Sequence, residues 1–151
     1  MRMGPRSLSA IALAATVLVA SGCGSSSKPL TRAELTMKAN AICKTVTAKL
    51  ASKTIKTQQD IGRVAGELAS FEQTALTDLS KLVPPAELEN DWKQFIVGAQ
   101  TLAENTAKLG EYAKAKNLKA ARGLIVSSTA VQHRMQATAK RDGLKECEQA
   151  A

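Results

Sequence analysis

The sequence predicts an all-α protein: an up-down-up-down four-helix bundle that follows a cleaved export signal and a short tether. Apolar residues recur every three or four positions, which is the period of amphipathic helices. Only four of the 151 residues are aromatic, and few stretches combine β-branched residues with strict alternation. The length suits one domain, which is expected to span residues 31–151.

The first helix is expected to begin at Thr31 and to fade near Lys53. Thr31 and Glu34 have the spacing of a capping box, in which two side chains satisfy free backbone N–H groups at the helix start. The apolar stripe of this helix consists of Leu35, Ala39, Ile42, Val46 and Leu50.

The second helix is expected over residues 57–82, and Val83-Pro84-Pro85 ends it because a residue before proline is pushed out of helical geometry. Pro85 suits the first turn of a third helix over residues 85–115, where its missing N–H costs little. The stripe of the second helix consists of Ile61, Val64, Leu68, Phe71, Ala75, Leu79 and Leu82. The stripe of the third consists of Leu88, Trp92, Phe95, Ala99, Leu102, Thr106, Leu109 and Ala113.

The fourth helix is expected to follow a cap at Asn117 and to end at Asp142-Gly143, with Gly143 as the left-handed residue after the last turn. Its stripe includes Leu118, Ala121, Leu124, Ile125, Ser128, Val131 and Met135. Leu144 is expected to fold back onto the core and to bring Cys147 towards the first helix. Short connections near 54–57, 83–85 and 115–117 favour antiparallel neighbours. A three-helix bundle with a detached first helix is the structural alternative.

Residues 1–22 have the layout of an export signal. Arg2 and Arg6 precede an uncharged apolar run that is too short, with these flanks, for a spanning helix. The run ends in Ala20-Ser21-Gly22-Cys23, which resembles the lipobox of bacterial lipoproteins. That resemblance implies a diacylglyceryl group on Cys23, a flexible tether over residues 23–30 and attachment to the outer face of the plasma membrane. A plain secretory signal is the alternative.

The cysteine count agrees with a lipid on Cys23. Three cysteines in an exported chain leave one over, and a lipid on Cys23 leaves Cys43 and Cys147 as a pair. Outside the reducing cytoplasm such a pair tends to form a disulfide, and the predicted topology makes the first helix a neighbour of the chain's end. Neither cysteine belongs to a C-x-x-C or Cys/His cluster, so a zinc site is not expected.

The sequence contains the motifs LTRAELTMKANAIC (30–43), PPAEL (84–88) and GLKEC (143–147). These three motifs resemble those of small exported lipoproteins that are common in actinobacteria. These motifs form a helix cap, a turn and two cysteines. The resemblance therefore implies a fold and a location, but no reaction.

Residues that carry chemistry are few, and neither a catalytic site nor a cofactor is expected. His133 is the only histidine, so the common charge-relay pairs and histidine-rich metal sites are not predicted. Glu87, Glu89 and Asp91 lie in the first turns of the third helix, where negative charge stabilises the helix end. A haem between Met37 and His133 is excluded because the predicted topology separates them by about 30 Å.

The positive charge is concentrated beside the predicted anchor. The chain carries a net charge of +8, yet residues 57–151 hold twelve Lys/Arg and twelve Asp/Glu. The excess in residues 28–56 comes from Lys28, Arg32, Lys38, Lys44, Lys49, Lys53 and Lys56. A lipid chain with adjacent basic residues is a two-signal route to membrane attachment, so anionic headgroups or wall polymers are candidate partners. A solvated surface is the alternative, and nucleic acid is not an expected partner.

The expected function is that of a non-enzymatic envelope lipoprotein whose bundle serves as an interaction or binding module for an unidentified envelope protein. The competing hypothesis is a carrier for a small apolar ligand or cofactor. Small residues on the stripes, which permit either close packing or internal space, are Ala65, Ala99, Ala103, Thr106 and Ser128. Close packing is favoured, whereas a continuous cavity above about 300 Å³ would favour a carrier.

Overall fold

The computed structural model describes residues 28–150, whose regular structure is entirely helical, as predicted. The predicted signal and Cys23 lie outside the described residues. The elements in chain order are α1 (Arg32–Ala51), α2 (Gln58–Ser80), the 3₁₀ helix η1 (Ala86–Leu88), α3 (Glu89–Lys114), α4 (Leu118–Asp142) and α5 (Lys145–Ala150).

Capping boxes start the first two helices. The Glu34 N–H donates to Thr31 Oγ1 at 3.3 Å, and the Thr31 N–H donates to Glu34 Oε2 at 2.8 Å, which confirms the predicted box. Thr57 and Asp60 form a second box at the start of α2, with distances of 2.9 and 3.2 Å. Both boxes satisfy backbone donors that a helix leaves unpaired at its first turn.

The two prolines end α2, but Pro85 lies just before the next helix and not in its first turn, where it was predicted. Its extended backbone (φ −68°, ψ 155°) places it before η1, and α3 begins only at Glu89. The Leu88 N–H donates to the Pro85 carbonyl oxygen at 2.9 Å, which closes the tighter 3₁₀ turn. The same connection holds the entry to α1, because the Leu30 N–H donates to the Val83 carbonyl oxygen at 2.9 Å.

The ends of α4 match the prediction, and a further helix follows. Asn117 Oδ1 accepts from the Ala120 N–H at 3.1 Å, and Gly143 has a left-handed φ of 76°. The chain then reverses, and the Leu144 N–H donates to the Ala139 carbonyl oxygen at 2.8 Å. The Leu144 side chain is buried. Helix α5, which the sequence analysis did not predict, begins at the next residue.

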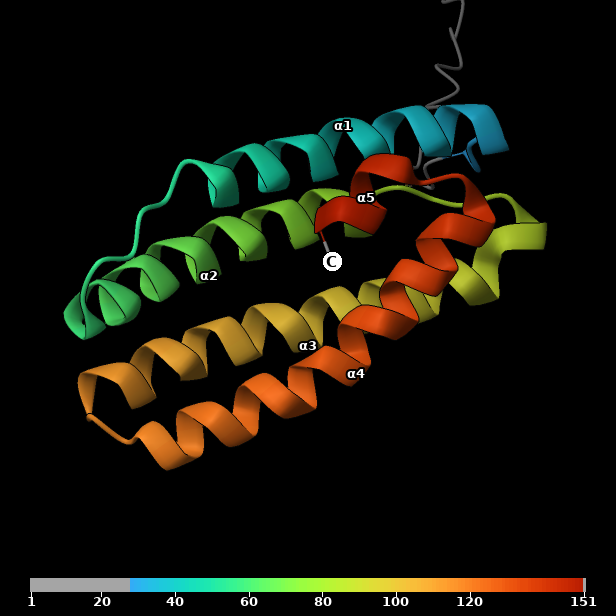
Figure 1. Cartoon of the computed structure of the whole chain (residues 1–151). Coiled ribbons are helices and arrows are strands. Elements are labelled where there is room, and N and C mark those ends of the chain that lie inside the picture. The colour runs from blue at the N-terminus through green and yellow to red at the C-terminus, as the bar shows by residue number, and fades with distance from the viewer. Residues whose placement is uncertain (1–27, 151) are drawn as a thin grey trace, which may run out of the picture.

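The helices pack in chain order, and the last helix returns to the first (Figure 1). α1 lies on α2, α2 on α3, and α3 on α4. α5 turns back from the end of α4 and contacts both α1 and α4. Within the described residues, α1 and α4 share at most marginal contact with each other. α5 therefore bridges the first and fourth helices at one end of the molecule.

A disulfide between Cys43 of α1 and Cys147 of α5 fixes this bridge, as the sequence predicted. The S–S distance is 2.07 Å, and the bond spans a sequence separation of 104 residues. The Asn40 Oδ1 atom also accepts from the Glu146 N–H at 3.0 Å. The main hydrophobic core surrounds the disulfide and includes Leu35, Ala39, Leu79, Leu88, Trp92, Phe95, Met135, Ala139 and Leu144.

Glycines allow close approach between the central helices. A Cβ atom on Gly98 of α3 would lie 2.5 Å from Cγ and 2.8 Å from Sδ of Met135 on α4. The exposed Gly66 of α2 differs, since a Cβ there would meet nothing within 4 Å. A substitution at Gly98 therefore reports on packing against Met135, whereas one at Gly66 reports on helix propensity alone.

We predict that replacing Cys43 and Cys147 together by alanine lowers the free energy of unfolding by about 2–5 kcal/mol, because the unfolded chain is no longer closed into a long loop. Urea denaturation followed by circular dichroism measures this loss. The native protein treated with dithiothreitol should show a comparable decrease, and the double variant should not respond to the reductant. An unchanged midpoint in the double variant would show that the bond contributes no stability.

Gly98→Ala and Gly66→Ala should have opposite effects on stability. The first should lower the free energy of unfolding by about 1–3 kcal/mol, because Met135 must leave its position. The second should raise it by about 0.5–1 kcal/mol, because alanine favours the helix more than glycine does. Thermal denaturation of both variants measures the difference, and equal shifts would contradict the packing at Gly98.

Candidate functional site

A cavity of about 340 Å³ lies among the helices, beside the disulfide. All five α-helices contribute to its wall, which includes Cys43 of α1 and Cys147 of α5. α5 fills one end of the space between α1 and α4, and the cavity continues beyond it. Ile55 and Ile125 line the cavity and are 54% and 53% exposed, so they mark its mouth.

The wall of the cavity is mostly apolar and contains four of the five small residues noted in the sequence. Those four are Ala65, Ala99, Thr106 and Ser128. Ala65 is closely packed against Gly110, as the sequence analysis favoured, but the other three residues border open space. The short side chains at these positions do not fill the space between the helices.

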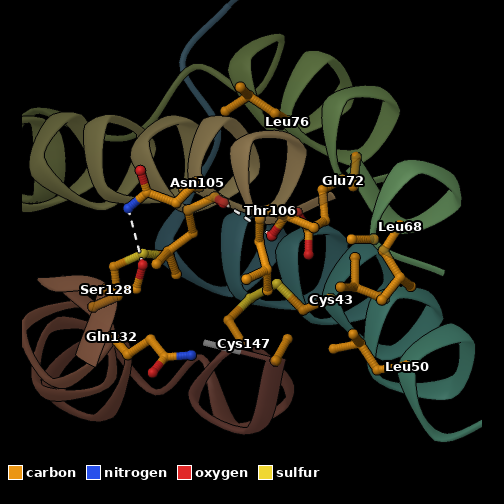
Figure 2. A pocket seen from close by; sticks show the side chains of 18 of the residues that line it. Cys43, Leu50, Leu68, Glu72, Leu76, Asn105, Thr106, Ser128, Gln132 and Cys147 are labelled. Atoms are coloured by element: carbon orange, nitrogen blue, oxygen red, sulfur yellow. Dashed lines mark hydrogen bonds between the residues drawn. A yellow bond between two sulfur atoms is a disulfide. The ribbon is translucent and has the colours of Figure 1, made fainter. Parts of the chain in front are cut away.

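Glu72 of α2 is the ionisable side chain in this wall, apart from the disulfide cysteines. Its Oε2 atom is buried and has no hydrogen-bond partner among the described residues. Burial raises the pKa of the Glu72 carboxyl above its ordinary value of 4.5, and a contact with the Thr106 hydroxyl opposes that shift. No charged side chain in the described residues contributes to this shift. Figure 2 shows Glu72 beside Thr106, with the disulfide close to both.

The hydrogen-bond donors around Glu72 are largely occupied within the protein. The Thr106 hydroxyl donates to the Leu102 carbonyl oxygen at 3.0 Å, and the Ser128 hydroxyl donates to the Leu124 carbonyl oxygen at 2.8 Å. The Asn105 amide donates across the helices to Ser128 Oγ at 3.0 Å, as Figure 2 shows. The hydroxyl protons of the wall are therefore engaged, and the Glu72 carboxylate is its strongest acceptor. The Gln132 amide of α4 also lines the cavity, as Figure 2 shows.

Sequence analysis missed Glu72, although a signal for it exists. Glu72 follows Leu68 by four residues and precedes Ala75 by three, so it occupies a stripe position of α2. The apolar Phe71 next to it was assigned to the stripe instead. A glutamate at helical spacing within an apolar seam indicates a buried carboxylate. Such a position is unusual, because glutamate is rarely buried unless it is paired.

Comparison of the chain with protein-family models, curated sequences and solved structures finds no match.

The seven predicted basic residues do not form one patch. The Lys49 ammonium lies 5.9 Å from the ring centroid of Phe71, and Lys53 forms an ion pair with Glu67. Arg32, Lys38 and Lys44 are spaced six residues apart, so they point about 120° from one another around α1. All three are exposed, as are Lys28 and Lys56.

Met37 and His133, the pair considered for haem, both face solvent, and Met37 is 65% exposed. The described residues contain no group of three or more His, Cys, Asp or Glu side chains placed to hold a metal ion. In the same part of the chain, no helix combines the length and apolarity that a membrane span needs.

We predict that Glu72→Gln changes how stability depends on pH. The folded protein binds the Glu72 proton more tightly than the unfolded chain does, so the native protein loses stability as the pH rises above 4.5 and through the raised pKa. The glutamine variant lacks this loss, and its advantage over the native protein should therefore grow with pH and vanish at acidic pH.

Urea denaturation at a series of pH values measures this difference between the two proteins. Burial also raises the pKa of Asp142, with a contribution from Asp91, but both proteins share that effect. Glu111→Gln removes a carboxylate from the exposed side of α3 and should leave the pH profile unchanged. If the free energies of unfolding of the native protein and Glu72→Gln change with pH in the same way, burial does not raise the pKa of the Glu72 carboxyl.

Proposed function

We propose that the protein is a non-enzymatic lipoprotein of the cell envelope whose helices form an up-down-up-down four-helix bundle and bind a small, mainly apolar molecule. The cavity of about 340 Å³ carries this proposal. Its volume falls within the range of about 300–1,000 Å³ that is usual for small-molecule sites. The carrier hypothesis is thereby favoured over a purely surface-mediated interaction module.

The composition of the wall supports an apolar ligand with one polar group. Burial of apolar ligand surface is favourable by about 25 cal/mol per Å², and most of the lining residues offer aliphatic or aromatic side chains. The polar residues of the wall are Glu72, Asn105, Thr106, Ser128 and Gln132. A few polar groups in an otherwise apolar pocket orient a ligand, whereas the apolar wall supplies most of the affinity.

The proposed location rests on the sequence and agrees with the disulfide. Cys23 follows a signal-like segment, and lipid on this residue would hold the helices at the outer face of the plasma membrane. A disulfide between Cys43 and Cys147 suits an oxidising compartment. Exposed basic residues of α1, such as Lys38 and Lys44, are then available to anionic headgroups or wall polymers. The resemblance to small exported lipoproteins is part of the same proposal.

Binding of the neutral fluorescent probe N-phenyl-1-naphthylamine tests this function. The probe should bind the native protein with an increase in fluorescence, because the cavity excludes water from its aromatic rings. Ala99→Leu fills part of the cavity from α3 and should weaken binding by about tenfold or more. Ala107→Leu adds the same side chain to an exposed position of the same helix and should bind the probe like the native protein.

Circular dichroism melting confirms that both leucine variants are folded before the titrations are compared. If the probe fails to bind the native protein, or if Ala99→Leu and Ala107→Leu bind it equally well, the cavity is not a ligand site.

A further inference from the structure

We infer that the cavity selects amphiphiles that carry a hydrogen-bond donor, above all a primary ammonium group, and discriminates against amphiphiles with an acidic headgroup. This inference rests on the proposed binding function and adds the chemical class of the ligand. Three features carry it: an unpartnered carboxylate oxygen, wall hydroxyl groups whose protons are already engaged, and an apolar wall around them.

The unpartnered oxygen is the first feature. Glu72 Oε2 is buried at the cavity, and the described residues offer it no hydrogen bond. A buried carboxylate without donors is costly, because it has lost water and gained nothing in return. A ligand that brings a donor to this atom supplies the missing hydrogen bond, so the site binds ligands with a donor more tightly than ligands without one.

The occupied donors around Glu72 are the second feature. The hydroxyl protons of Thr106 and Ser128 are directed to backbone carbonyl oxygens one turn earlier on their own helices. The Asn105 amide donates to Ser128 Oγ. A carboxylate or phosphate on a ligand placed beside Glu72 would therefore receive no hydroxyl proton from Thr106 or Ser128 and would meet the Glu72 carboxylate. Like charges at short distance in a poorly hydrated site repel each other strongly. The Gln132 amide also lines the cavity, but it carries no charge to offset that repulsion.

The absence of a charged partner for Glu72 is consistent with a cationic ligand. None of the lining residues is a lysine, arginine or histidine, so a ligand ammonium would be the counter-ion. A charge-assisted hydrogen bond between an ammonium and a carboxylate is roughly twice as strong as a neutral one. The pair also removes the unfavourable burial of a lone charge.

The apolar wall is the third feature and determines the rest of the ligand. Val46 and Leu50 of α1 and Leu68 and Leu76 of α2 all line the cavity. Towards the mouth, the exposed Ile55 and Ile125 continue the apolar surface. A flexible alkyl chain can follow this path from Glu72 to the mouth, which identifies the ligand class as alkyl amines and related amphiphiles with a donor headgroup.

Displacement of N-phenyl-1-naphthylamine by three ligands of equal chain length tests this inference: decylamine, decanol and decanoate. The native protein should bind decylamine most tightly, decanol less tightly and decanoate least, with about tenfold or more between the amine and the acid. Each ligand is used below the concentration at which it forms micelles.

Glu72→Gln is the decisive variant, because glutamine keeps the shape of the side chain, removes its charge and adds a donor. Decylamine should bind this variant about tenfold more weakly, whereas decanoate should bind it more tightly. Glu111→Gln makes the same chemical change outside the cavity and should retain the native order of affinities. Thermal melting of both variants establishes that they are folded.

The possible outcomes separate this inference from the proposed function. If the three ligands displace the probe equally well and Ala99→Leu weakens all three, the cavity is an apolar site without headgroup selection, and the inference is wrong. If Glu72→Gln leaves the order unchanged, the selection does not come from Glu72. If neither the probe nor any of the ligands binds, the proposed function fails together with the inference.

Discussion

The disulfide between α1 and α5 lies at the centre of an extensive contact between these two helices, which exceeds the contact between α1 and α2. α5 has only six residues, and a helix of that length is not stable alone in water. The disulfide, the Asn40–Glu146 hydrogen bond and the buried Leu144 keep it in place. α1 and α4 barely touch each other within the described residues, and this short helix lies between them. Its residues Cys147 and Ala150 also form part of the cavity wall.

The molecule combines a tightly packed side with a loosely packed one. Gly62 and Gly110 are buried where α2 meets α3, and a Cβ on Gly110 would lie 3.3 Å from the Cβ of Ala65. Gly98 permits a similar approach of Met135 on α4. Helices α2, α3 and α4 therefore form a closely packed side of the cavity, and α1 closes the other side without filling the interior. Glu72 lies on the closely packed side, where its position is fixed by its neighbours rather than by an ion pair.

Local signals in the sequence were sufficient to predict most helix boundaries. Thr31 with Glu34, Asn117 and Gly143 each act within a few residues, and each occupies its expected position. Pro85 was predicted within the first helical turn but lies just before it, because proline is compatible with several positions near a helix start. α5 could not be predicted, since six residues are too few to reveal an apolar period. The disulfide was predictable from the count of cysteines and the order of helices.

The cavity could not be predicted from the sequence, and the reason is physical. Small residues such as Ala99 and Ser128 allow two helices to approach closely, and they equally leave a void when the helices stay apart. Which of these occurs depends on how all the helices are arranged, and the residues of a single stripe do not determine that arrangement. Glu72 was overlooked because it lies next to Phe71, whose larger apolar side chain dominates the local pattern. Its burial becomes visible only once α3 is placed against α2.

The location of α5 at the end of the chain also bears on the order in which the protein matures. Protein synthesis is vectorial, and domains fold as their sequences emerge. Helices α1 to α4 precede Cys147 in the chain, so all four are synthesised before the disulfide with Cys43 can close. The covalent link between α1 and α5 is therefore the last constraint that the fold acquires.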